Sequence, residues 1–140
     1  MTHRTIHIRN WKVDVFIDDG GPLDIDRVLG IMYGMGAGFD TIEEAEDIML
    51  GVRPNEAFTF SVWRHTVIYI GWTTSGAEFL NSMKHEIRHL IDHIANAYGI
   101  DKSGEEVGYM SGDAAYLLAG DICHFGCDHC RQNNYEYELD

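Results

Sequence analysis

Five consecutive residues in the second half of the chain have the types and spacing of a hydrolytic metal site. They are His85, Glu86, Ile87, Arg88 and His89, an H-E-x-x-H motif within a long segment of helical apolar periodicity. On a helix, His85 and His89 project from the same face, so both imidazoles can bind one zinc ion. Glu86 is then placed to act as general base on a water bound to that ion. The motif therefore predicts zinc-dependent hydrolysis of a peptide bond.

A catalytic zinc usually has three protein ligands and one open position for water, so a third ligand must come from another part of the chain. The candidates are Glu105, Glu106, Asp113 and His93. His93 lies a full turn beyond His89, which disfavours convergence of three histidines from one straight helix. Glu106 is expected to be occupied as the last residue of a capping box that begins at Ser103. We therefore prefer Glu105 as the third ligand. Asp113 remains an alternative, because an antiparallel return of the next helix would bring it level with His89.

Composition limits the class of protein. The 140 residues are expected to form one domain, residues 1–140, large enough for a single core. The 23 acidic and 10 basic residues give a net charge of −13, which disfavours nucleic acid and anionic membrane surfaces as partners. No apolar run is long enough to span a bilayer, and no signal-peptide pattern follows Met1. With only three clustered cysteines in addition, we expect a cytoplasmic protein without a disulfide framework.

Hydrophobic periodicity predicts an α+β fold in which a short antiparallel or mixed sheet packs on the motif helix and on the helix that follows it. The motif helix is bounded by a capping box of Ser75 and Glu78 and by Gly99. A capping box of Thr41 and Glu44 opens an earlier helix. The predicted elements are a strand over 5–17, helices over 24–34 and 41–50, a hairpin of strands 58–62 and 67–70 that turns at Arg64-His65, and helices over 76–98 and 104–119.

The C-terminal tail, residues 122–140, contains a second group of metal-binding side chains. Cys123, Cys127 and Cys130 lie close to His124 and His129. They could form half of a structural zinc site or remain reduced thiols, and their spacing matches no recognised zinc finger. One of these cysteines could also approach the zinc at His85 and His89 and close its open position, which would make that site structural.

The motif and the segment that follows it resemble the gluzincin family of zinc metallopeptidases. The residues that carry this resemblance are His85-Glu86-x-x-His89 and Glu105-x-x-Gly108-Tyr109, where several gluzincins have E-x-x-A-D or E-x-x-A-N. The longer string HEIRHLIDHIANAYGI…GEEVGYMSGD is also similar to small proteins of bacterial mobile elements and phages. The resemblance covers roughly residues 67–113.

The resemblance implies a minimal zincin-like domain with Zn²⁺ bound by His85, His89 and Glu105. Glu86 would be the catalytic acid and base, and Tyr109 would orient a histidine. The strand over 67–72 would be the sheet edge along which a peptide or protein substrate aligns. The alternative from a different class is a catalytically inactive, zinc-stabilised binding or regulatory protein of a mobile element. The sequence indicates neither the substrate nor the oligomeric state.

Overall fold

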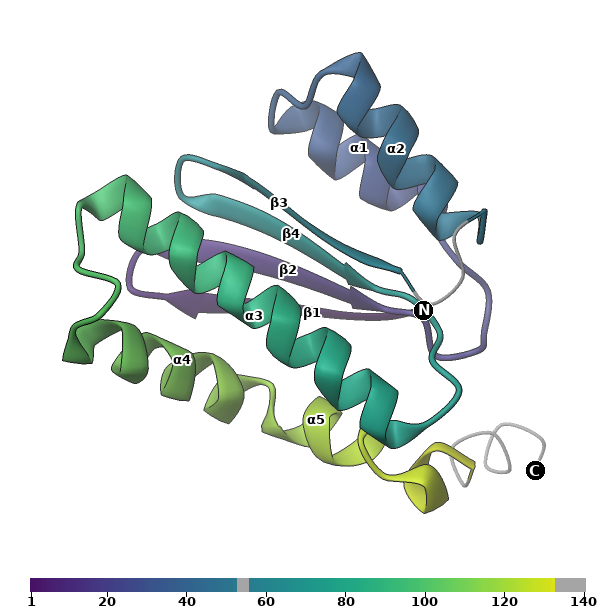
Figure 1. The fold of residues 1–140 in the computed structure, drawn as a ribbon. Coiled ribbons are helices and arrows are strands. Elements are labelled where there is room, and N and C mark those ends of the chain that lie inside the picture. The colour runs from purple at the N-terminus through teal and green to yellow at the C-terminus, as the bar shows by residue number, and fades with distance from the viewer. Residues whose placement is uncertain (53–55, 133–140) are drawn as a thin grey trace.

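The computed structural model describes residues 1–52 and 56–132, which form a four-stranded mixed sheet with helices on both faces (Figure 1). The strands are β1 (Thr2–Ile8), β2 (Trp11–Ile17), β3 (Ala57–Val62) and β4 (His65–Ile70). Their order in the sheet is β1-β2-β4-β3. The hairpins β1–β2 and β3–β4 are antiparallel, and β2 pairs with β4 in parallel. The predicted α+β class with a mixed sheet is confirmed.

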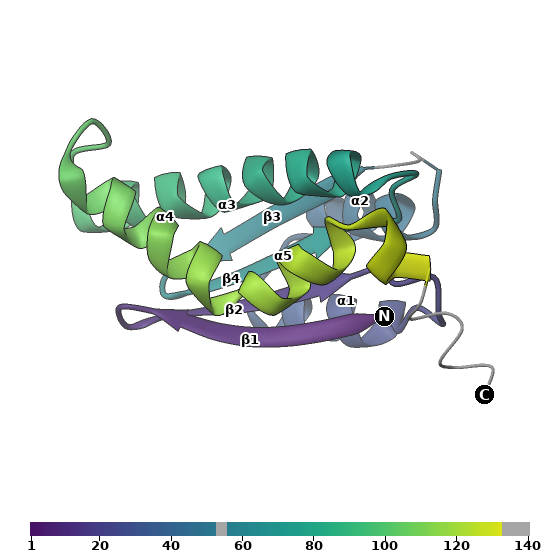
Figure 2. The same cartoon turned by 90° about the horizontal axis from the view of Figure 1, so that it is seen from below.

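Helices cover the two faces of the sheet in different ways. On one face lie α1 (Ile25–Gly34) and α2 (Phe39–Met49), and on the other lie α3 (Gly76–Tyr98), α4 (Glu105–Leu117) and α5 (Ala119–Phe125). The view from below shows α4 and α5 along the β1 side of the sheet (Figure 2). Helix α3 instead contacts β3 and β4. The motif helix therefore lies over the half of the sheet that ends at the edge strand β3.

The alternation of side chains along the central strands explains why both faces are covered. Val13, Val15 and Ile17 of β2 pack into the core under α3 and α4, whereas Phe16 packs under α1 and α2. All of these side chains are buried. Because successive residues of a strand point to opposite faces, an apolar strand of this kind needs a layer on each side.

Local signals define the ends of the motif helix as the sequence predicts. The Ser75 hydroxyl oxygen accepts a hydrogen bond from the backbone N–H of Glu78, and Gly99 adopts a left-handed conformation with φ 69°. Glu78 itself accepts from the backbone and hydroxyl of Thr74, so the second half of the capping box is shifted by one residue. The predicted helix over 24–34 is confirmed as α1. The β3–β4 hairpin is confirmed, but its turn is Trp63-Arg64 and not Arg64-His65, because His65 already belongs to β4.

Three boundary predictions are wrong. The strand expected over 5–17 is a hairpin, since Arg9 turns the chain with φ 51° and β1 pairs with β2 along its length. Helix α2 begins at Phe39 with Gly38 at its N-cap, so Thr41 opens no capping box. The helix expected over 104–119 ends at Leu117 and is followed by the separate helix α5.

Two further corrections affect the site directly. Gly104, not Ser103, is the N-cap of α4, and Glu106 accepts a hydrogen bond from Arg9 at 3.0 Å instead of closing a capping box. The edge strand is also different from the one that the family resemblance implies. Strand β4, which contains residues 67–70 of the expected segment 67–72, lies inside the sheet between β2 and β3, so the edge strands are β1 and, on the α3 side, β3. No helix in residues 1–52 and 56–132 is long and apolar enough to cross a membrane.

A buried carboxylate ties three strands together on the α1–α2 face. Asp14 of β2 is 3% exposed and accepts hydrogen bonds from the Thr5 hydroxyl at 2.7 Å, from His3 Nε2 at 2.8 Å and from His65 Nε2 at 2.7 Å. Burial raises the pKa of Asp14, but the hydrogen bonds from His65, Thr5 and His3 outweigh burial, so the pKa lies below the ordinary 3.8. The ionised form is thus stabilised by folding.

We expect Asp14→Asn to reduce the free energy of unfolding by about 2 kcal/mol at pH 5, since charge-assisted hydrogen bonds to a buried group are lost. Because the folded pKa is lowered, the contribution of the carboxylate is complete above the unfolded pKa and is lost as the pH falls through the folded pKa. Urea unfolding of the unmodified chain and of Asp14→Asn at pH 5 and pH 3 measures the two free energies of unfolding. The difference between these free energies should be smaller at pH 3 than at pH 5. An unchanged difference would contradict the role of the ionised carboxylate.

Candidate metal centre

The two motif histidines meet on the exposed side of α3. Both side chains are exposed, and His85 Nε2 lies 2.9 Å from His89 Nε2 with the rings nearly perpendicular at 87°. Zinc–imidazole bonds are about 2.0–2.1 Å long, so two nitrogens bound to one ion lie at most about 4.2 Å apart. The pair therefore fits two coordination positions of a single ion, as the four-residue spacing predicts.

Glu86 points away from solvent, toward the edge strand. Its side chain is buried, and its carboxylate Oε2 accepts a hydrogen bond of 2.6 Å from the Thr59 hydroxyl of β3. One residue corresponds to about 100° around a helix, so Glu86 turns from the face of His85 toward the sheet. The bond to Thr59 holds the carboxylate at the seam between α3 and β3.

His93 is bound into a separate chain of hydrogen bonds. Its Nδ1 lies 2.6 Å from the Ser61 hydroxyl, Ser61 lies 2.7 Å from the Thr66 hydroxyl, and Trp11 Nε1 donates to Thr66 at 2.8 Å. When each hydroxyl donates along this chain, Nδ1 of His93 accepts and the ring proton is on Nε2. Burial first, and then the nearby His89, lowers the pKa of His93, which favours this neutral form.

This arrangement leaves His93 outside the histidine pair. Its ring centroid is 6.3 Å from that of His89, and one of its nitrogens is occupied by Ser61. The expectation that His93 does not converge with His85 and His89 agrees with this geometry. His93 instead connects α3 to the edge strand, about two helical turns beyond the Glu86–Thr59 contact.

Helix α4 lies on the opposite side of α3 from the histidines. The residues of α3 that line the space facing α4 include Ile87 and Ile91. Each follows a motif histidine by two residues, which is about 200° around the helix. Glu105 is exposed at the start of α4, and Asp113 is exposed in its middle. The structure therefore does not bring Glu105 or Asp113 to the histidine pair.

The other predicted site residues of α4 are also separate from the pair. Glu106 is engaged by Arg9 of the β1–β2 hairpin. The ring of Tyr109 is 64% exposed, and its position does not orient a motif histidine. Within residues 1–52 and 56–132, no group of three His, Cys, Asp or Glu side chains is close enough together to hold a metal ion. The structure thus brings His85 and His89 together, and it brings no third candidate ligand to them within these described ranges.

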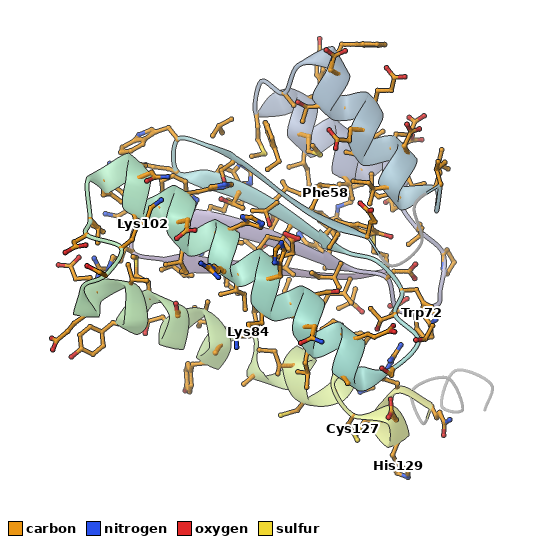
Figure 3. All side chains as sticks on the ribbon, viewed as in Figure 1. Phe58, Trp72, Lys84, Lys102, Cys127 and His129 are labelled. Atoms are coloured by element: carbon orange, nitrogen blue, oxygen red, sulfur yellow. The ribbon has the colours of Figure 1, made fainter. Side chains whose placement is uncertain are left out.

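The cysteines lie at the other end of α3. Cys127 and His129 are placed past α5, near the start of α3 (Figure 3). There the backbone N–H of Gly76 donates to Asp128 at 2.7 Å. From Gly76 to His85 is nine residues, or about 14 Å of helix, so no described cysteine closes the position at the histidine pair.

The three thiols are free, and two of them interact. The backbone N–H and then the side chain of Cys130 lower the pKa of Cys127, whereas the Cys127 side chain raises the pKa of Cys130. These contacts join Cys127 and Cys130 to each other. Within the described part of the chain, the cysteines and neighbouring histidines do not form a group that could hold a metal ion. The rest of the predicted tail, residues 133–140, lies outside the described residues.

Thr59 and Ser61 are the site residues that sequence reasoning missed. They alternate with Phe58 and Phe60, which pack under α1 and α2. Period-two alternation in 57–62 therefore places two hydroxyls on the face toward α3. The sequence contains this alternation, but it does not indicate that the strand packs against the motif helix.

No protein-family model matches the chain, and no curated protein or solved structure matches it.

Proposed function

We propose that the chain is a small zinc-dependent metallopeptidase of the zincin type. His85 and His89 would hold the zinc ion, and Glu86 would be the general base. The observation that carries the proposal is the convergence of His85 Nε2 and His89 Nε2 at 2.9 Å on the helix that also carries Glu86, whose carboxylate Thr59 holds in place. The chemical class of these donors, two imidazoles on an exposed helix face, suits zinc.

A bound zinc ion would supply Lewis-acid chemistry, which lowers the pKa of water and polarises a carbonyl group. The protein supplies the proton transfers. Glu86 would accept a proton from the attacking water and donate it to the leaving amine, as a general base and then a general acid. Thr59 positions this carboxylate by donating to one of its oxygens. Tyr109 has no role in the proposed reaction, since its ring is exposed on α4.

The edge strand supports a peptide as the substrate. Strand β3 has a partner on one side only, and Thr59 and Ser61 join it to α3 beside the motif. An extended peptide can add to such an edge through main-chain hydrogen bonds. We propose that a peptide or protein segment aligns along β3, which would bring a scissile carbonyl toward Glu86.

The second candidate is a zinc-stabilised binding or regulatory protein without catalysis. The observation that favours it is the lack of a third ligand for the histidine pair within the described residues. The net charge of −13 would suit a basic partner.

The test is metal-dependent cleavage of a peptide library. The full chain is stripped with a chelator, reloaded with one equivalent of zinc and incubated with the library, and new peptide termini are read by mass spectrometry. We expect cleavage that requires zinc and returns on its re-addition. Stoichiometric zinc binding without any cleavage would favour the binding protein instead, and a chain that takes up no zinc would overturn both candidates.

A further inference from the structure

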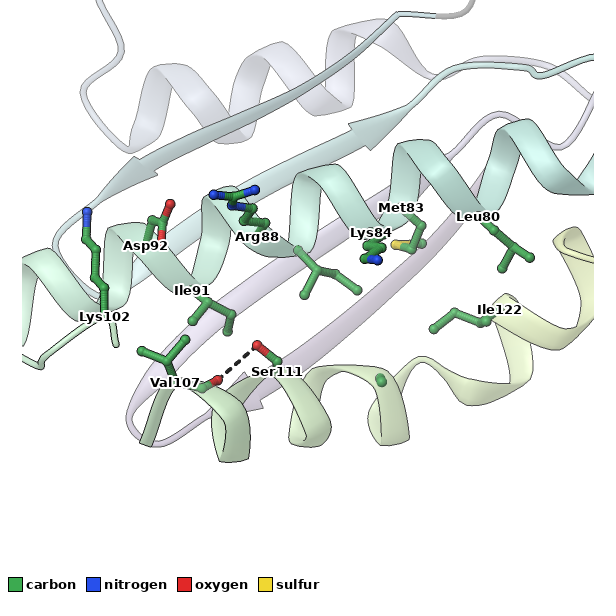
Figure 4. Close-up of a pocket in the computed structure, with 12 residues that line it drawn as sticks. Leu80, Met83, Lys84, Arg88, Ile91, Asp92, Lys102, Val107, Ser111 and Ile122 are labelled. Atoms are coloured by element: carbon green, nitrogen blue, oxygen red, sulfur yellow. Dashed lines mark hydrogen bonds between the residues drawn. The ribbon is translucent and has the colours of Figure 1, made fainter. Parts of the chain in front are cut away.

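A cavity of about 660 Å³ lies between α3 and α4 and reaches α5 (Figure 4). Neither His85 nor His89 is among the residues that line it. Its apolar lining is Leu80, Met83, Ile87, Ile91, Val107, Ala115 and Ile122. Ligand pockets typically measure about 300–1,000 Å³ and are lined mainly by apolar groups, so this cavity has the size and character of a small-molecule site.

Side-chain size explains why the space between the two helices is not filled. On α4 the residues facing the cavity are Val107, Ser111 and Ala115, which recur every fourth residue and are all small. Ser111 donates its hydroxyl to the Val107 carbonyl at 2.9 Å, so it offers no unsatisfied donor to the cavity. The interior of the cavity is therefore effectively apolar.

The edge of the cavity is cationic, which is unusual for this chain. Lys84, Arg88 and Lys102 line it, three of the ten Lys and Arg residues in a chain of net charge −13. Asp92 is the one acidic residue among the described lining. None of the three cations makes an ion pair or a hydrogen bond with another residue of 1–52 or 56–132. They are exposed and available to an anion.

We propose that this groove binds a small amphipathic anion, with an alkyl chain against the apolar wall and an acidic head group at the cationic edge, beside Lys84 and Arg88. Charge complementarity selects an anion, because an isolated cationic edge on an acidic protein repels cations and attracts a carboxylate or phosphate. The apolar wall selects a chain, because burial of alkyl surface supplies most of the affinity in such a pocket. The proposal does not depend on the metal site.

Binding is measured by titration calorimetry on the full chain below the micellar concentration of each probe. The probes are dodecanoate, dodecyl phosphate and dodecyltrimethylammonium, which share the chain and differ in the head group. We expect one site per chain and at least about tenfold tighter binding of the anions than of the cation. The stronger of the two anions identifies a carboxylate or a phosphate as the natural head group. Equal binding of anion and cation would overturn the proposal.

Variants locate the site. Ala115→Trp is expected to fill the groove and weaken dodecanoate binding by about tenfold or more, and Val107→Phe provides a second filling variant if the first does not fold. Arg88→Gln should weaken the anion several-fold without affecting the cation. The matched controls are Arg27→Gln, which removes an equal charge from α1, and Ala97→Trp, an equal enlargement outside this groove. Unchanged dodecanoate affinity in both filling variants would show that the probe binds elsewhere.

Discussion

Replacement of Glu86 by Gln should lower the turnover number for peptide cleavage by about 10²–10⁴-fold, the range that a general base contributes. Gln has nearly the same shape, and its amide oxygen can still accept the hydrogen bond from Thr59. The substitution therefore removes the proton acceptor while the packing between α3 and β3 stays in place. Zinc content and thermal stability should remain close to those of the unmodified chain.

The measurement is the single-turnover rate of the best substrate from the peptide library, with zinc content determined on the same samples. Asp113→Asn is the control, because it removes one negative charge from an exposed position on α4. The Asp113→Asn variant should cleave the substrate at the same rate as the unmodified chain. If Glu86→Gln keeps full activity with zinc bound, Glu86 is not the general base; if it loses zinc, the carboxylate supports the metal instead.

His85→Ala should weaken zinc binding by at least about 100-fold, because it removes one of the two imidazoles that converge at 2.9 Å. His89→Ala should have the same effect. Glu105→Ala should leave zinc affinity unchanged, because α4 packs on the side of α3 that faces away from the histidines. Competition with a chromophoric chelator measures the affinities, and mass spectrometry under native conditions counts the bound ions.

Cys127→Ala is the matched control for a metal at the other end of α3. Zinc that persists in His85→Ala and is lost in Cys127→Ala would move the metal to the cysteines and remove the basis of the peptidase proposal. A loss of affinity in Glu105→Ala equal to that in His85→Ala would show that α4 carries the third ligand after all.

Local signals predicted most of the elements but not all of their limits. The Ser75 cap and Gly99 define α3 correctly, because a capping hydroxyl and a left-handed glycine act within a few residues. The β1–β2 hairpin was missed because Arg9, whose positive φ turns the chain, is not a glycine, although the apolar alternation changes phase between Ile8 and Trp11. Glu106 was assigned to a cap although a distant partner, Arg9, engages it. Such long-range competition has no local signature.

By itself, the sequence determined the motif helix and the convergence of His85 and His89, because a helical repeat of 3.6 residues places positions four apart on one face. Only the tertiary structure decided what meets each face: Thr59 of the edge strand at Glu86, and α4 against Ile87 and Ile91, away from the histidines. The physical reason is that periodicity fixes direction around a single helix, whereas burial of apolar surface between distant segments decides which neighbour occupies each direction.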